Sequence, residues 1–126
     1  MNTNLKIMAF LLMGITTQAQ DMANGKQVYT KVCQACHQPT GAGIPGAFPP
    51  LAKADYLNAD VNRAIKQIIK GSSGPMTVNG KQYNTAMPAQ GNLSDKDIAD
   101  VLTYVYGSWG NSKKTITLAM VKAQRK

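Results

Sequence analysis

The sequence of 126 residues contains only two cysteines, a single histidine and no glutamate. Two cysteines cannot supply the disulfide framework that stabilises many small exported domains. The apolar run at residues 7–15 is too short to cross a membrane, which takes about 20 apolar residues. A chain of this length suits one domain with a thin core, so another source of stability, such as a covalently bound group, is expected.

Acidic side chains are also scarce, because six aspartates face fourteen lysines and arginines for a formal net charge of +8. A basic surface predicts an acidic partner or an anionic membrane face. Nucleic acid is the other common partner of basic proteins. The scattered lysines and the lack of a nucleic-acid-binding motif argue against it.

The first residues have the pattern of an export signal. A polar start with Lys6 precedes the apolar run, and Thr17-Gln18-Ala19 ends in a small residue. This order is typical of a secretory signal peptide. We predict that residues 1–19 are cleaved, which leaves 126 − 19 = 107 residues; retention of the segment as an anchor is the alternative.

The sequence Cys33-Gln34-Ala35-Cys36-His37 has the C-x-x-C-H spacing of covalent haem attachment. Two thiols one helical turn apart can each add to one of the two vinyl groups of the porphyrin. The following residue, His37, is then held under the iron as its proximal ligand. This predicts one haem c attached through Cys33 and Cys36. The single histidine excludes two-histidine ligation within one chain.

An electron-transfer haem also needs a sixth iron ligand, and a methionine thioether suits that position. Four methionines follow the predicted signal: Met22, Met76, Met87 and Met120. Met87 stands in an irregular segment before Pro88, which fixes the backbone, and it is the predicted ligand. Met76, at the start of a predicted hairpin, is the alternative.

Residues 38–50 form a loop rich in proline and glycine. A ligating histidine almost always donates its second ring N–H to a fixed acceptor. We expect the carbonyl of Pro49, rather than that of Pro50, to be this acceptor. Phe48 and Leu51 are expected to lie against the haem.

Two predicted helices are expected to cross. The first begins after a capping residue, Asp21, and leads into Cys33. Gly25 lies inside it, although glycine costs about 1 kcal/mol relative to alanine in a helix interior. We therefore expect a second helix, near Tyr104, to pass closely at Gly25. This second helix is capped by Ser94.

Other local signals complete the expected structure. Asp97 is predicted to complete a capping box with Ser94, and a further helix is predicted from Asn58 or Asp60 to Gly71. Asn79-Gly80 predicts a two-residue hairpin between residues 76–78 and 81–83. Near the end of the chain, Trp109 is expected to pack and Thr117 to cap a short last helix.

The cysteine pair also has two other possible interpretations. C-x-x-C is also the motif of thiol–disulfide oxidoreductases, but it then occurs in a βαβ context that this sequence lacks. Two cysteines and one histidine fall one ligand short of a structural zinc site. A covalently bound haem colours the protein, so the colour of the purified protein distinguishes the haem interpretation from the thiol and zinc interpretations.

These features resemble the class I cytochrome c family. The resemblance rests on the haem motif, Pro49-Pro50-Leu51, Met87-Pro88 and the helix with Tyr104. Within that family the chain is most similar to small cytochromes and cytochrome domains associated with copper nitrite reductases, haem-copper oxidases and periplasmic dehydrogenases. The finer likeness is in Gly43-Ile44-Pro45-Gly46, Val78-Asn79-Gly80 with Tyr83, and Ser108-Trp109-Gly110-Asn111.

The resemblance implies an all-α, class I cytochrome c fold of three to five helices around one covalently bound haem, with a small β-hairpin. His37 and Met87 would bind the iron. The expected organisation is a signal at residues 1–19, a cytochrome c domain at 20–111 and a basic tail at 112–126.

The resulting hypothesis is a periplasmic mono-haem carrier of single electrons, exported in a Gram-negative bacterium, rather than an enzyme. Its expected partners are redox proteins with acidic docking surfaces, such as a terminal oxidase, a nitrite reductase or a dehydrogenase. A cytochrome subunit of a larger redox complex is one alternative. A haem enzyme or gas sensor with an open sixth site is another, against which Met87 argues.

Overall fold

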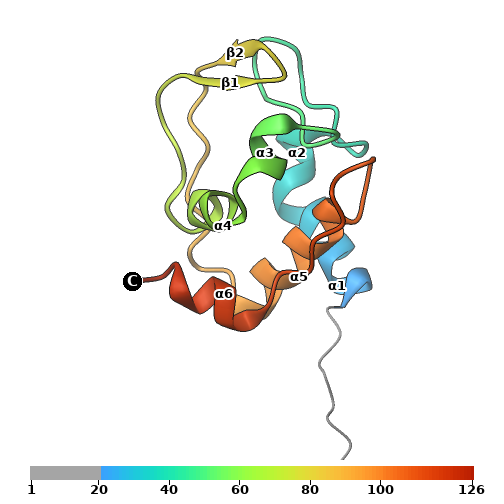
Figure 1. Ribbon diagram of the computed structural model, residues 1–126, viewed down its shortest axis with the longest axis vertical. Coiled ribbons are helices and arrows are strands. Elements are labelled where there is room, and N and C mark those ends of the chain that lie inside the picture. Colours follow the sequence, from blue (N-terminus) through green and yellow to red (C-terminus); the bar gives the residue numbers. More distant parts are fainter. Residues whose placement is uncertain (1–20) are drawn as a thin grey trace, which may run out of the picture.

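The structure, a computed structural model, describes residues 21–126, and the predicted signal at residues 1–19 lies outside them. Within the described part of the chain, none of the helices has the length and apolar character needed to span a bilayer. The described residues form a mostly helical domain with one two-stranded antiparallel sheet (Figure 1).

The elements follow one another along the chain in a simple order. The N-terminal helix is continuous through three parts, α1 (Met22–Val28), the π-helical turn η1 (Tyr29–Cys33) and α2 (Gln34–His37). The remaining elements are α3 (Asp55–Ala59), α4 (Val61–Lys70), β1 (Met76–Val78), β2 (Lys81–Tyr83), α5 (Asp95–Tyr106) and α6 (Leu118–Ala123). If the N-terminal helix counts once, the described residues contain five helices, as the all-α prediction allowed.

The crossing of α1 and α5 confirms the prediction made for Gly25. A Cβ added to Gly25 would lie 2.8 Å from the Cβ of Tyr104, and nearer still to the backbone oxygen of Asp100. Asp21 caps α1 as predicted, since its side chain accepts a hydrogen bond from the Asn24 N–H at 3.0 Å. The two helices therefore meet backbone to backbone at the one residue without a side chain.

A buried carboxylate ties the two crossing helices together. Asp100, only 1% exposed, accepts hydrogen bonds from the Asp21 N–H at 3.1 Å, the Asn24 amide at 2.9 Å and the Lys96 ammonium. Burial alone would raise the pKa of Asp100, but the bonds from Lys96, Asn24 and Asp21 together hold it below its usual value. The sequence analysis did not identify this contact.

The predicted capping box at the start of α5 forms only in part. The Ser94 hydroxyl accepts from the Asp97 N–H at 3.0 Å, as predicted. The Asp97 carboxylate turns instead to α1, where it accepts from the Asn24 side-chain amide at 2.9 Å. A contact between helices has thus replaced the second half of a local motif.

The hairpin and α4 follow the predictions, whereas α3 is an addition. Met76 pairs with Tyr83 across the hairpin, and Asp60 caps α4 by accepting from the Arg63 N–H at 3.0 Å. At the start of α3, Asp55 and Asn79 exchange two hydrogen bonds of 2.8 and 3.0 Å between side chain and backbone. The hairpin turn therefore fixes where α3 begins.

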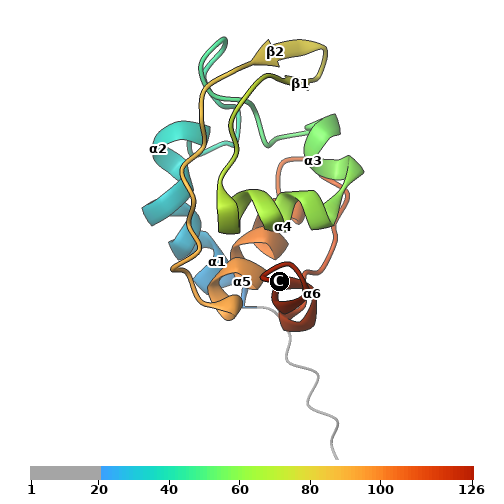
Figure 2. The same ribbon diagram turned by 90° about the vertical axis from the view of Figure 1, so that its left-hand side faces the viewer.

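The segment after residue 111 packs against the domain. Thr117 caps α6, as predicted, by accepting from the Met120 N–H at 3.2 Å. Ile116 and Val121 are fully buried, and the Ile116 N–H donates to the Thr103 hydroxyl of α5 at 2.9 Å. In Figures 1 and 2, α6 lies beside α5, at the end of the molecule opposite the hairpin.

Candidate functional site

The cysteine pair and His37 sit where the N-terminal helix changes its winding. A single π-helical turn ends at Cys33, and the short helix α2 carries the rest of the motif to His37. Gln38 then takes a left-handed φ of 68°, which stops the helix. The Tyr29 hydroxyl donates to the Gln38 carbonyl at 2.6 Å, so η1 fixes the residue next to the histidine.

The ring of His37 is held by the loop that follows it. Its Nδ1 lies 2.9 Å from the Pro49 carbonyl oxygen, which confirms Pro49 over Pro50 as the acceptor. This bond assigns the proton to Nδ1 and leaves the other ring nitrogen, Nε2, with a free lone pair. The Gly43 N–H also donates to the His37 carbonyl at 2.9 Å, so both the ring and the backbone are fixed.

A cavity opens against this face of His37. Its empty space, counted together with the open solvent at its mouth, is about 1020 Å³, and its lining is mostly apolar. Cys33, Cys36, His37 and Met87, the four predicted site residues, all line it. Phe48 and Leu51 line it as well, as predicted.

Two of the four methionines considered as ligands reach the cavity, Met87 and Met76. Met22 is 44% exposed on α1, and Met120 packs within the C-terminal segment, where its sulfur lies 3.5 Å from the Thr117 nitrogen. The Met87 backbone pairs with Ser72 through reciprocal hydrogen bonds of 3.0 and 2.9 Å. This bridge fixes the position of Met87 in the irregular segment.

Arg63 on α4 is a cavity residue that the sequence analysis missed. Its guanidinium carbon lies 3.5 Å above the centre of the Tyr56 ring, and Nη2 donates to the Tyr56 carbonyl at 2.5 Å. The Nε–H is buried and has no hydrogen-bond partner in the protein. A buried unsatisfied donor is costly, and a carboxylate of a bound group would satisfy this one.

Asn111 belongs to the Ser108-Trp109-Gly110-Asn111 stretch named above, but the sequence analysis did not identify its role. Its buried amide donates to the carbonyl of Leu51 at 3.0 Å and to that of Val105 at 2.9 Å, and Asn58 donates to its oxygen at 3.1 Å. Asn111 thereby joins the loop behind Pro49 to the end of α5. Only the fold could reveal this role, because Leu51 and Asn58 lie far away in the sequence.

Three aromatic rings pack behind the haem-binding motif. The centroid of the Tyr29 ring lies 5.8 Å from that of Tyr104 and 5.2 Å from that of Trp109, and the last two lie 5.9 Å apart. Trp109 also covers Gly41, where an added Cβ would meet the indole at 2.5 Å. These contacts confirm packing as the role of Trp109.

The environment of Cys33 argues against thiol–disulfide catalysis. Burial, and next the neighbouring Cys36, raises the pKa of the Cys33 thiol to about 11. Thiol–disulfide enzymes instead lower this pKa to obtain a thiolate. Burial also lowers the pKa of His37, against the opposing effect of its bond to Pro49, and a neutral imidazole is the form that binds metals.

The zinc alternative also lacks support. The described residues contain no group of three or more His, Cys or acidic side chains that could hold a metal ion. What the site offers is an apolar cavity with two thiols, one oriented imidazole and two thioethers on its wall. This set fits a porphyrin carrying its own iron.

Comparison with known proteins gives the same answer. Residues 22–109 match the profile of the family described as Cytochrome c. The chain is 42% identical to cytochrome c-552 of Thermus thermophilus over 112 residues, which cover 86% of this chain and 74% of that protein. It is 35% identical to cytochrome c6 of Cyanidioschyzon merolae over 89 residues, which cover 69% of this chain and 74% of that protein.

A subunit of a larger enzyme is also similar. The cytochrome c subunit of gluconate 2-dehydrogenase from Pantoea cypripedii is 33% identical over 113 residues, or 86% of this chain and 25% of that subunit. Together with Cys33 and Cys36 in the spacing that attaches haem c, these matches settle the relationship. The chain belongs to the cytochrome c family.

Proposed function

We propose that this protein is an exported carrier of single electrons between redox partners, with His37 and Met87 as the axial ligands of its haem c. One observation carries the proposal: the oriented His37 ring and the tethered Met87 line the same cavity as the attachment cysteines. A role as the cytochrome subunit of a larger complex fits the same site, because one of the similar proteins is such a subunit.

When bound, the haem supplies an iron that changes its oxidation state by one electron. His37 and Met87 would hold the iron within rigid surroundings, so little would have to rearrange when it gains or loses an electron. His37 is held by the Pro49 carbonyl, and Met87 by its bridge to Ser72. The Nε–H of Arg63 would hold a haem carboxylate within the cavity.

If His37 and Met87 both bind the iron, the site does not offer the open coordination position that a haem enzyme or gas sensor needs. We therefore infer electron transfer rather than catalysis. The pattern of residues 1–19 supports export, and periplasmic location in a Gram-negative bacterium is part of the proposal.

The charge distribution supports acidic redox partners. Residues 33–52 and 82–94, which supply many of the cavity-lining side chains, contain no lysine, arginine or aspartate. The cations lie outside these segments, and without Lys6 the chain has 13 basic and 6 acidic residues, a net charge of +7. Such a charge would steer an acidic partner towards an uncharged contact surface.

Replacement of each cavity methionine tests the ligand assignment. In the oxidised holoprotein we expect Met87→Ala to lose the absorption band of methionine–iron(III) ligation and Met76→Ala to keep it. Met76→Ala is the matched control, because both side chains line the cavity. A band that survives Met87→Ala would overturn the assignment, and a colourless protein from a host that attaches haem c would overturn the function.

A further inference from the structure

The segment that joins Met87 to α5 is fastened to the end of α4. Met87 is bridged to Ser72, and the Gln90 N–H donates to the Ile68 carbonyl at 2.7 Å. Gly91 lies so close that an added Cβ would meet the Ile69 carbonyl oxygen at 2.8 Å. In Figure 2 this segment runs from β2 past α4 to the start of α5.

A third fastening comes from the other end of the chain. The guanidinium of Arg125 donates from Nε to the Asp95 carboxylate at 2.6 Å, from Nη1 to the Gly91 carbonyl at 3.0 Å and from Nη2 to the Leu93 carbonyl at 2.7 Å. Two of these acceptors are backbone groups of the Met87 segment itself. A planar arginine side chain suits such a set, because its donors are fixed relative to one another.

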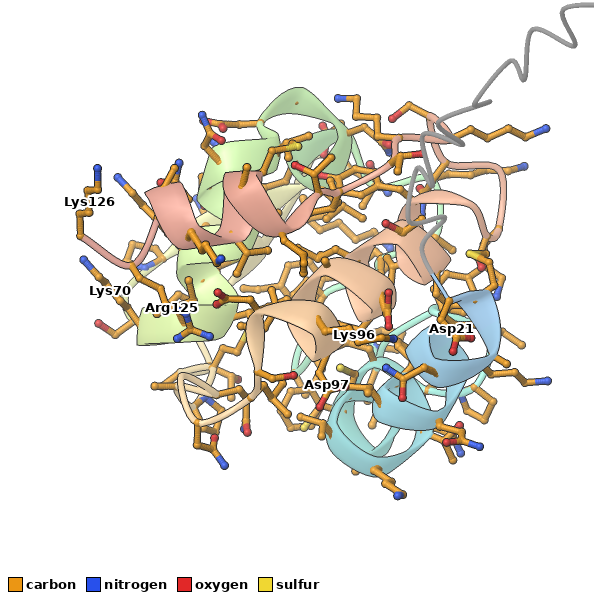
Figure 3. All side chains as sticks on the ribbon, turned by 90° about the horizontal axis from the view of Figure 1, so that it is seen from below. Asp21, Lys70, Lys96, Asp97, Arg125 and Lys126 are labelled. Atoms are coloured by element: carbon orange, nitrogen blue, oxygen red, sulfur yellow. The ribbon has the colours of Figure 1, made fainter. Side chains whose placement is uncertain are left out.

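Arg125 is delivered by a packed structure rather than by a loose terminus. The buried residues Ile116 and Val121 anchor the C-terminal segment on α5, and Thr117 caps α6. Figure 3 shows Arg125 beneath α6, on the side of the segment that precedes α5, whereas Lys126 and Lys70 point away from the domain. The match to the cytochrome c profile ends at residue 109, so Arg125 lies outside the matched residues.

From this geometry we propose that Arg125 is a positioning residue for the sixth iron ligand. It holds the backbone on the C-terminal side of Met87 and so keeps the thioether in place. The inference rests on the proposed axial role of Met87. According to this proposal, the last residues of the chain help to keep the haem site intact.

Displacement of Met87 by an added ligand measures this role. Imidazole can bind the iron only in molecules whose Met87 has moved away, so its apparent affinity rises in proportion to that population. In the full-length oxidised holoprotein we expect Arg125→Ala to bind imidazole roughly tenfold more tightly than the wild type, a factor equivalent to about 1.4 kcal/mol. The loss of the methionine–iron band reports binding.

Lys126→Ala is the matched control, because it removes the same charge one residue away from a side chain that points outward. It should leave the imidazole affinity within about twofold of the wild type, as is usual for exposed surface substitutions. Equal changes in both variants, or none in Arg125→Ala, would overturn the positioning role. Asp95→Asn, which weakens one of the three contacts, should give a smaller increase and serves if Arg125→Ala does not mature.

The same experiment distinguishes a failure of the positioning role of Arg125 from a failure of the ligand role of Met87. If Met87→Ala abolishes the band while Arg125→Ala behaves as the wild type, the ligand assignment stands and the role of Arg125 is refuted. If Met87→Ala retains the band, the ligand assignment itself fails.

Discussion

Replacement of Gly25 by alanine sets two opposing effects against each other at the crossing of α1 and α5. Alanine is the better helix former, so propensity alone would stabilise α1 by about 1 kcal/mol. The new Cβ, however, would lie 2.8 Å from the Cβ of Tyr104 and closer still to the Asp100 carbonyl oxygen. Neither neighbour can rotate away, and overpacking of this kind costs about 1–3 kcal/mol.

Separation of the helices adds a second cost. Asp100 accepts hydrogen bonds across the crossing from Asp21 and Asn24, and these bonds lengthen as α1 moves away. A buried carboxylate that loses a partner costs about 1–3 kcal/mol. The two costs together outweigh the gain in helix propensity, so we expect Gly25→Ala to lower the free energy of unfolding by about 2 kcal/mol. For a domain of this size, that loss corresponds to a fall in the melting temperature of roughly 8–16 °C.

Guanidinium unfolding of the holoprotein, followed by the fluorescence of the single tryptophan Trp109, measures this loss. Ala23→Gly is the matched control, because it makes the reverse change at an exposed position of the same helix and should cost only the propensity term of about 1 kcal/mol. A Gly25→Ala protein as stable as the wild type would refute the close crossing.

Two further predictions concern the charges around the haem. Arg63→Met should lower the reduction potential by on the order of 50 mV, equivalent to about 1 kcal/mol, because a cation beside the haem favours the reduced state. Lys66→Ala is the control, since Lys66 lies on the exposed face of the same helix, and it should shift the potential far less. Equal shifts in the two variants would contradict a role for Arg63 in the cavity. The rate of electron exchange with an acidic redox protein should fall as ionic strength rises, since salt screens the attraction to a chain of net charge +7. A rate independent of salt, measured by stopped-flow mixing, would exclude electrostatic steering.

Features that depend on nearby residues could be predicted from the sequence. Each of these features depends on residues that lie within a few positions of one another: the haem motif, the caps at Asp21 and Ser94, and the Asn79-Gly80 turn. The contact between His37 and Pro49 belongs to this group, because the two residues lie only 12 positions apart and a rigid loop joins them. The crossing at Gly25 was predictable for another reason, since a glycine inside a helix calls for a close neighbour.

Features that depend on distant partners could not be predicted. The π-helical turn before Cys33 has no signal of its own in the sequence. Asp97 satisfies the pattern of a capping box, but its carboxylate instead accepts a hydrogen bond from Asn24, 73 residues away. Arg63 stands next to the apolar stripe of α4 and so resembles an ordinary surface cation, although it faces the cavity.

The two sides of the haem site therefore differ in how they are held. On the His37 side, covalent attachment through Cys33 and Cys36 would add to contacts such as that from His37 to Pro49. The Met87 side has no covalent link to the haem and depends on hydrogen bonds alone, of which those from Arg125 to the Met87 segment span more than 30 residues. Local opening begins where few buried contacts hold a segment, so if Met87 and His37 are the ligands as proposed, we expect Met87 to leave the iron before His37 does. An electron carrier has to prevent that opening, and the proposed contacts of Arg125 would help the packed C-terminal segment to do so.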